Sequence, residues 1–302
     1  MQMSKDVRDT PYLNHNDVVG LNFIRNPSRY CFRRHYRAGL RSHIMEILDP
    51  ESIERERKGV VLDGLRRYPR PEPLRMLRIF RIRFQSIGDA EEEVKRVKIV
   101  QAYLAPDYVA NSEEFLVDYT INEKREILLC GLQEYVGGEV INPWSAFDRA
   151  HLISLFHRMG LRARENTEKE IDRWIDSVRG KAQVFTRRIK QMIIEADHVP
   201  DLAGVGNLIL TRSGHLKLVD VNNISQVFFD PMIRLDDRGY PVCDKSIEAL
   251  YLLESKVAGQ SPQKGDRIYE TFMDPERMNV VMELDRRFHR STKHAHPYYG
   301  SS

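Results

Sequence analysis

The feature that most constrains this chain is a short segment in which polar residues bracket two apolar runs. Residues 207–220 read NLILTRSGHLKLVD, with Gly214 between the runs. Alternating apolar runs separated by a turn residue predict a β-hairpin. Asp201 and Asn207 precede the first run and Asp220 ends the second. We therefore expect the hairpin to let these oxygen-bearing side chains converge.

These three residue types suit the chemistry of a hard metal ion and a proton acceptor. Carboxylate and amide oxygens are the ligands that Mg²⁺ prefers, so Asn207 and Asp220 are candidate metal ligands. Asp201 is a candidate to orient an attacking hydroxyl or accept its proton. The alternative is that Asp201 and Asp220 are turn or capping residues and that Asn207 only starts a strand.

Length and composition place the chain among ordinary globular proteins. It has 302 residues, of which 41% are hydrophobic and 30% charged, enough for one large domain or two lobes. No apolar run has the length of a membrane span, and the opening residues lack a signal core, so a cytoplasmic location is expected. Cys31, Cys130 and Cys243 lie far apart in the sequence, which favours reduced thiols over a metal knuckle or a disulfide framework.

Positive charge is concentrated in the first third, although the net charge is only +3. The arginines of this region include Arg25, Arg29, Arg33, Arg34, Arg37, Arg41, Arg66, Arg67, Arg70, Arg75, Arg78, Arg81 and Arg83. Such a field favours an anionic partner such as a phosphate, a nucleotide, a nucleic acid or a membrane surface. The alternative for any one arginine is a solvated helix or loop face.

Hydrophobic periodicity predicts a sheet-rich first part and a helical second part. Residues 1–20 look loosely structured, and RSHIMEIL with the charged stretch 51–68 reads as helical. Strands are expected at 30–36, 77–84, 113–121 and 126–136, and helices at 89–104, 152–159, 168–197 and 243–257. Prolines at 68–73 and the glycine pair at 137–138 interrupt the pattern.

This order of elements, with Asp201, Asn207 and Asp220 around a hairpin, resembles the protein-kinase-like fold. The resemblance implies an α+β, two-lobed structure with a small antiparallel-sheet N-lobe containing one helix and a mainly helical C-lobe. Residues 1–74 would form a basic extension and the start of the N-lobe. Residues 75–136 would complete that lobe and end in a hinge, and residues 137–302 would form the C-lobe.

The segment LQEYVGGEV (132–140) independently resembles the hinge of protein kinases. By that resemblance, Glu134 would offer its carbonyl and Val136 its amide to the adenine edge. Glu139 would offer its carboxylate to the ribose, and Gln133 would sit at the gatekeeper position. Asp201 would be the catalytic aspartate, and Asn207 and Asp220 would bind the metal.

The family carries a lysine on its third strand, and the matching strand here, LRIFRIRF (77–84), has none. Arg81 or Arg83 would then have to reach the phosphates, since arginine binds phosphate bidentately. The partner acid on the following helix would be Glu93 or Glu92. The alternative is that these acids only complement the helix dipole.

The resemblance implies ATP and Mg²⁺ as cofactors and transfer of the γ-phosphate to a hydroxyl of a protein or a small molecule. The arginine-rich region favours an anionic acceptor. The alternative is a pseudokinase with a scaffolding or regulatory role and weak or no nucleotide binding. The absence of a glycine-rich loop, apart from single glycines at Gly20 and Gly39, favours this alternative. Nucleic-acid binding through FRRHYRAGLRSH (32–43) is a third, less favoured class.

Overall fold

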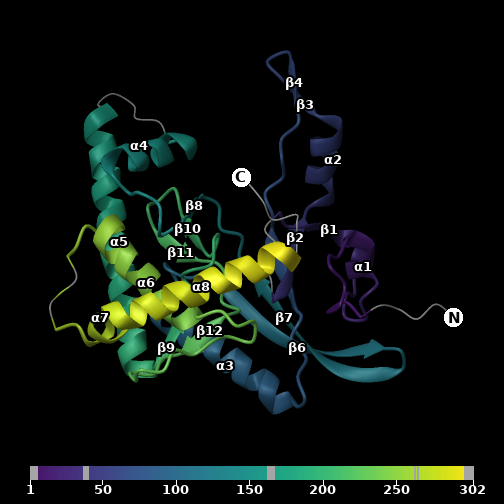
Figure 1. Cartoon of the computed structure of the whole chain (residues 1–302). Coiled ribbons are helices and arrows are strands. Elements are labelled where there is room, and N and C mark those ends of the chain that lie inside the picture. Colours follow the sequence, from purple (N-terminus) through teal and green to yellow (C-terminus); the bar gives the residue numbers. More distant parts are fainter. Residues whose placement is uncertain (1–5, 37–40, 162–166, 262, 264, 296–302) are drawn as a thin grey trace. The chain divides into compact units, whose positions relative to one another are not determined.

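The computed structural model of the protein describes residues 6–36, 41–161, 167–261, 263 and 265–295. Gly39 therefore lies outside the described residues. The described chain is α+β, and its strands pair antiparallel (Figure 1). It divides into two compact units. The first comprises residues 1–96 and 110–135, and the second comprises residues 97–109 and 136–302.

A five-stranded sheet forms the frame of the first unit. Its strands lie in the order β1 (Cys31–Arg34), β2 (Ser42–Leu48), β5 (Arg75–Phe80), β7 (Lys124–Gln133) and β6 (Ser112–Ile121). Helix α3 (Ile87–Leu104) follows β5, begins in the first unit and ends in the second. Residues 1–74 are thus integral to this sheet, because they contribute β1 and β2.

The helical prediction for RSHIMEIL is wrong, since these residues form β2. Five of the seven residues of this strand are buried, and the other two are half-buried. A strand covered on both faces does not show the alternation of apolar and polar residues that marks a half-exposed strand. Its sequence therefore cannot be told from a buried helix by periodicity alone.

One face of the sheet is covered by the amino-terminal segment, which we define as residues 6–30. Val7, Leu13 and Val18 of this segment form a hydrophobic core with Met45 and Leu77 of the sheet. Helix α1 (His15–Val19) lies within the segment and is capped by Asn14. The prediction of loose structure is therefore wrong for residues 6–20.

The opposite face of the sheet carries several buried polar residues. Glu46, Arg78 and Gln133 all lie on it, because the register pairs Glu46 with Met76, Met76 with Gln133, and Arg78 with Gly131. These three side chains belong to residues no more than 4% exposed. Burial of such groups is costly unless they form ion pairs or hydrogen bonds.

Between β2 and β5 the chain forms helix α2 (Pro50–Lys58) and a ribbon of β3 (Val60–Leu62) and β4 (Leu65–Arg67). Asp49 caps the helix by accepting a hydrogen bond from the Ser52 amide. Asp63 and Gly64 join the two strands with φ of 51° and 76°, the left-handed values that a two-residue hairpin turn requires. The helical prediction is thus correct for residues 50–58 and wrong for the ribbon.

The second unit is mainly helical. Its helices are α4 (Arg149–Arg158), α5 (Thr167–Ala196), α6 (Val242–Leu252), α7 (Arg267–Phe272) and α8 (Pro275–Ala295), with a π-helical turn (Leu253–Val257) after α6. These confirm the helices predicted at 152–159, 168–197 and 243–257. Buried residues of α5, including Phe185 and Ile189, join one core with Leu250 and Phe272. Among the described residues, none of the helices combines the length and apolarity of a membrane span.

Two small sheets accompany these helices. β11 (Leu216–Leu218), β10 (Leu208–Leu210) and β8 (Glu139–Ile141) form one sheet in that order. β12 (Ile224–Gln226) pairs with β9 (His198–Pro200) in the other. The loop after β9 and the loop before β12 carry the polar residues of the candidate site.

Candidate functional site

The candidate site is built at the open end of the β10–β11 hairpin. Leu208 pairs with Leu218 and Leu210 with Leu216, which confirms the hairpin predicted for residues 207–220. Beyond the last pair, the Val219 amide donates a 2.8 Å hydrogen bond to the Asn207 carbonyl. This pairing brings Asn207 and the residue after Val219, Asp220, to the same end of the hairpin.

Asp201 is tied to this end by hydrogen bonds from both flanking loops. Its Oδ1 accepts from the backbone amides of Ala203 (3.0 Å) and Gly204 (2.9 Å). The Nδ2 of Asn207 donates to the Asp201 carbonyl at 2.8 Å. Asn223 accepts from the Asp201 amide through its carbonyl and donates to Oδ2 through its side chain at 3.4 Å. Asp201 and Asn207 are therefore held in one network.

Gly204 is required by this arrangement. A Cβ at this position would lie 2.4 Å from the Nδ2 of Asn207, closer than non-bonded atoms approach. Glycine thus lets the loop pass directly over the Asn207 side chain. Because Nδ2 donates to Asp201, the Oδ1 of Asn207 is the atom suited to meet a cation.

The electrostatics of the site favour Asp201 as a proton acceptor. Burial raises the pKa of Asp201, and the negative charge of Asp220 raises it further. Hydrogen bonds from Gly204, Asn223 and Ala203 act in the opposite direction and stabilise the carboxylate. The influence of Asp220 also shows that the two carboxyl groups lie near enough to interact. A carboxylate with a raised pKa is a stronger base than an ordinary aspartate.

The donor set at this end fits a hard cation with few protein ligands. Asn207 and Asp220 offer an amide and a carboxylate, and the Asp220 Oδ1 accepts a 3.0 Å hydrogen bond from the Asn222 amide. Mg²⁺ keeps several waters and is completed by substrate phosphates, so two protein ligands suit it. Within the described ranges, no group of three or more histidine, cysteine, aspartate or glutamate side chains is placed to hold a metal ion.

The hinge-like residues divide between the two units. Glu134 belongs to the first unit, which ends at Tyr135. Its amide donates to the Asn111 carbonyl at 2.8 Å, and its carboxylate accepts from the Asn111 amide at 3.0 Å. Val136 begins the second stretch of the second unit. The carboxylate of Glu139, predicted to meet a ribose, forms a 3.0 Å salt bridge with Arg158 of α4.

Arg81 and Arg83 lie outside the strand on which they were predicted, because β5 ends at Phe80. The predicted strand boundary is therefore wrong. Arg81 donates to the Nε2 of His43 at 3.2 Å and to the Thr10 and Pro11 carbonyls. His43 pairs with Ile79, on the face of the sheet opposite to Gln133.

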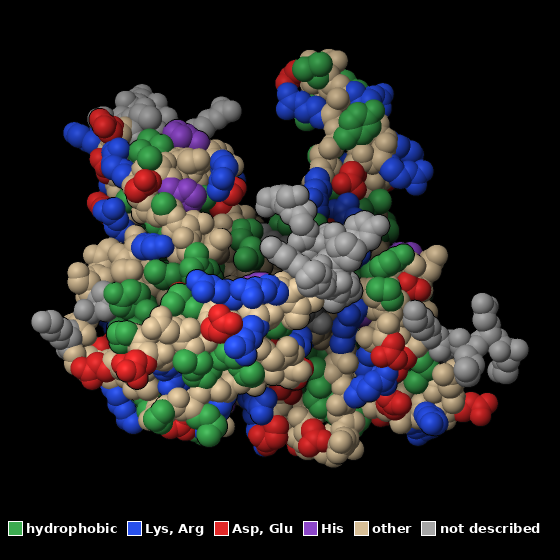
Figure 2. All heavy atoms as spheres, in the orientation of Figure 1, with side chains coloured by type: hydrophobic (Ala, Val, Ile, Leu, Met, Phe, Trp, Pro, Cys, Tyr) green, Lys and Arg blue, Asp and Glu red, His purple; other side chains and the backbone are tan. Residues whose placement is uncertain are grey.

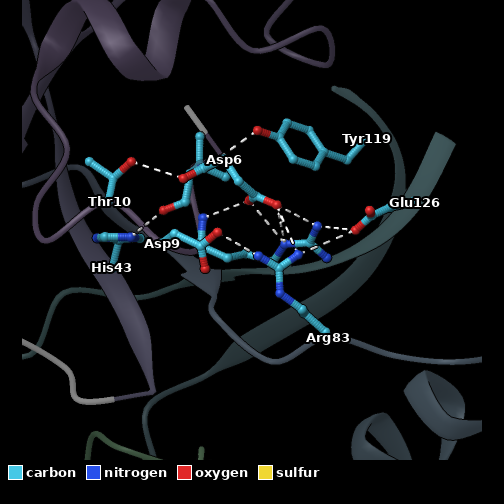
Figure 3. A network of polar contacts seen from close by, with 9 residues as sticks. Asp6, Asp9, Thr10, His43, Arg83, Tyr119 and Glu126 are labelled. Carbon is cyan, nitrogen blue, oxygen red and sulfur yellow. Dashed lines mark hydrogen bonds and ion pairs between the residues drawn. The ribbon is translucent and has the colours of Figure 1, made fainter. Parts of the chain in front are cut away.

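Arg83 is likewise engaged with the amino-terminal segment. It forms salt bridges with Asp6 at 3.0 Å and Asp9 at 2.6 Å, and lies 3.6 Å from Glu126 of β7 (Figure 3). Both predicted phosphate-binding arginines thus anchor the segment to the sheet. Glu93, their predicted partner acid, forms a 3.2 Å ion pair with Arg96 one turn further along α3.

Arg78 is the cation that the sequence analysis missed. It lies in the middle of β5, on the same face as Gln133, and its residue is 1% exposed. One guanidinium nitrogen lies 3.8 Å from the carboxylate of Glu114 on β6, and the guanidinium lies over the Phe80 ring. The sequence carries no local signal for this position, because the neighbouring residues Met76, Leu77, Ile79 and Phe80 are all apolar and show no alternation.

Comparisons with known proteins give no assignment. No family model matches the chain, and no curated protein matches its sequence.

Proposed function

We propose that the chain is a divergent phosphotransferase of the protein-kinase-like fold that uses ATP and Mg²⁺. It would transfer the γ-phosphate to a hydroxyl of a protein or a small molecule. The observation that carries the proposal is the hydrogen-bonded network of Asp201 and Asn207 at the hairpin end where Asp220 also lies. Two features of the fold also support it. Helix α3 follows β5, the third strand of the antiparallel sheet in chain order, and the second unit is mainly helical.

Each residue of the network has a role in this proposal. Asn207 and Asp220 would hold Mg²⁺, which would neutralise charge on the phosphates. Asp201 would orient the acceptor hydroxyl and take its proton as the oxygen attacks phosphorus. The backbone amides that bind its Oδ1 fix the carboxylate, and its raised pKa strengthens it as a base.

We assign to Arg78, instead of Arg81 or Arg83, the phosphate-binding role that a lysine on the third strand has in the kinase family. Arg78 is always charged, binds phosphate in a fixed planar geometry and lies on the strand face that carries Gln133. Its acid partner would be Glu114 on a neighbouring strand instead of a glutamate on α3. Glu134 and Val136 remain the proposed backbone contacts to adenine.

The proposal also includes the charge of the acceptor and the location of the enzyme in the cell. Most of the arginines in the first third are exposed or half-buried, which favours an anionic acceptor. A cytoplasmic location, where ATP is abundant, suits such an enzyme.

A pseudokinase is the second candidate, and one contact favours it. Glu139 is bound to Arg158, so a protein group occupies the carboxylate that would bind the ribose of a nucleotide. In that case the hairpin network would serve only the stability of the second unit. Chemistry at Asp201 distinguishes the two candidates.

The test is phosphate transfer from ATP labelled at the γ-position, in the presence of Mg²⁺, to the protein itself and to a panel of hydroxyl acceptors. Asp201→Asn should lower the transfer rate by at least ~100-fold, because it removes the proton acceptor. Asp176→Asn, an equal charge change on an exposed position of α5, should retain the wild-type rate. Nucleotide binding without transfer to any acceptor would favour the pseudokinase, and full activity of Asp201→Asn would exclude the proposed role.

A further inference from the structure

The segment between β2 and β5, residues 49–70, forms an arm that projects from the sheet of the first unit (Figure 1). No residue of α2, β3 or β4 is buried. A nine-residue helix and a two-stranded ribbon are each marginal when they bury no apolar surface. The arm therefore presents its side chains to solvent instead of using them for a core.

Large apolar side chains are exposed on the ribbon of this arm. Val61, Leu62 and Leu65 are 57%, 51% and 64% exposed. Leu62 pairs directly with Leu65 across the Asp63–Gly64 turn, so the two leucines stand side by side at the apex. Val60 lies on the same face of the ribbon, two residue pairs away from the leucine pair. An apolar apex of this kind marks an interaction surface.

Positive charge surrounds the apolar apex. Residues 57–67 contain Arg57, Lys58, Arg66 and Arg67 and a single acid, Asp63. Arg67 pairs with Val60 and so shares the ribbon face of the two leucines. Arg66 donates to the Lys58 carbonyl at 2.6 Å, which ties the ribbon to the end of α2. Figure 2 shows apolar and basic side chains next to one another on this arm.

We propose that this arm docks onto an anionic lipid surface. Leu62 and Leu65 would enter the boundary between headgroups and acyl chains, and the cations behind them would bind lipid phosphates and carboxylates. The order along the arm, with apolar groups at the apex and cations below, matches the polarity profile of a membrane interface. Asp63 at the turn keeps the insertion shallow, since a carboxylate is costly in hydrocarbon.

The side chains of the arm favour a lipid surface over nucleic acid as its binding partner. A surface that binds nucleic-acid phosphates needs cations, and exposed aliphatic side chains add nothing to those contacts. Nucleic-acid surfaces commonly use aromatic stacking, and the apex of this arm carries leucines instead. The inference concerns the first unit alone and does not depend on the proposed phosphotransferase.

The experiment is sedimentation of the full chain with vesicles of phosphatidylcholine alone or with added phosphatidylserine, at low and high salt. We expect binding to the anionic vesicles that weakens as salt rises. Leu62→Ser with Leu65→Ser should weaken it at least ~tenfold. Arg67→Ser should weaken it about fivefold, and Arg290→Ser, an equal charge loss at an exposed position of α8, should have little effect.

A second readout keeps the test independent of folding. Because the arm buries nothing, the double leucine variant should unfold at the wild-type denaturant midpoint. An environment-sensitive dye attached at Asp63→Cys, in a Cys31→Ser background, should report an apolar environment when anionic vesicles are added. Absence of vesicle binding at low salt, equal loss in Arg290→Ser, a silent dye, or binding to short nucleic acids in place of vesicles would each overturn the proposal.

Discussion

The environment of Asp201 departs from that of an ordinary surface aspartate. Its carboxylate is held by two backbone amides and lies near Asp220, in a half-buried loop. Both burial and the neighbouring charge favour the protonated form, while the amides favour the ionised one. A site that retains two interacting acids stores unfavourable energy, which is typical of functional positions.

This environment predicts a pH dependence of stability. The pKa of Asp201 is raised above its ordinary value of 3.8, so the folded state holds this proton more tightly than the unfolded state. The ionisation of Asp201 therefore leaves the free energy of unfolding unchanged at low pH and lowers it as the pH rises above about 4. Asp201→Asn keeps an oxygen for both amides and removes the ionisation.

We therefore expect Asp201→Asn to be more stable than the wild type at neutral pH, with the difference vanishing near pH 3. The measurement is the free energy of unfolding in urea at both pH values. A variant that is less stable at neutral pH would show that the amide hydrogen bonds require the charged carboxylate.

The site could be predicted from sequence only where it is local. Asp201, Asn207 and Asp220 are joined by one hairpin, whose turn and alternation are visible in the sequence. Arg78 could not be identified in the same way, because its direction depends on the pairing of β5 with β7. That register is set by contacts between residues distant in the sequence.

At the scale of elements, the amino-terminal segment is stabilised by a buried arginine. Arg8 is 4% exposed and binds Asp6 at 2.7 Å and also Glu126 of β7. Burial alone would raise the pKa of Asp6. The hydrogen bonds and positive charge of Arg8 outweigh this effect and lower the pKa to about 2. Arg83 reaches the same two acids from a side chain that is 47% exposed.

We expect Arg8→Met to lower the free energy of unfolding by about 3 kcal/mol, because it removes the buried cation that binds two half-buried acids. Arg83→Met is the matched control and should cost less than about 1 kcal/mol. A lowered pKa means that the Asp6 contribution is present above its ordinary value of 3.8 and is lost as the pH falls toward 2.

The measurement for this pair is urea unfolding at neutral pH and near pH 2. The difference between Arg8→Met and wild type should be largest at neutral pH and smaller in acid. Equal effects of the two substitutions would contradict the account, because they would show that burial of Arg8 does not matter.

Elements differed in how well their sequences predicted them, for physical reasons. The helix predicted at 168–197 forms as α5, Thr167–Ala196. A long apolar stripe with helical period is compatible with few structures other than an amphipathic helix. β2 was misread because its surroundings bury it on both faces. The β3–β4 ribbon was also misread, although its Asp-Gly pair is a strong local hairpin signal. The charged residues on both sides of the ribbon are typical of a solvated helix and obscure that signal.

At the scale of the whole molecule, the chain consists of a sheet-based unit and a mainly helical unit, each with its own core. The hydrogen-bonded network of Asp201, Asn207 and Asn223 lies entirely within the second unit. The buried cation Arg78 lies in the first, and the hinge-like residues Glu134 and Val136 lie at the division between them. The central claim is that the hairpin end binds a nucleotide through a metal ion.

The most direct test of that claim is calorimetric titration of ATP into the full chain with and without Mg²⁺. Asp220→Asn should abolish the Mg²⁺-dependent part of the affinity, and Gly204→Ala should weaken it because its Cβ would displace the Asn207 side chain. Gly180→Ala, at a helical position with open space around it, is the control and should match the wild type. Binding that strengthens with Mg²⁺ and follows this order of variants is the predicted result. A folded wild type that binds no ATP, or binds it equally without Mg²⁺, would contradict the account.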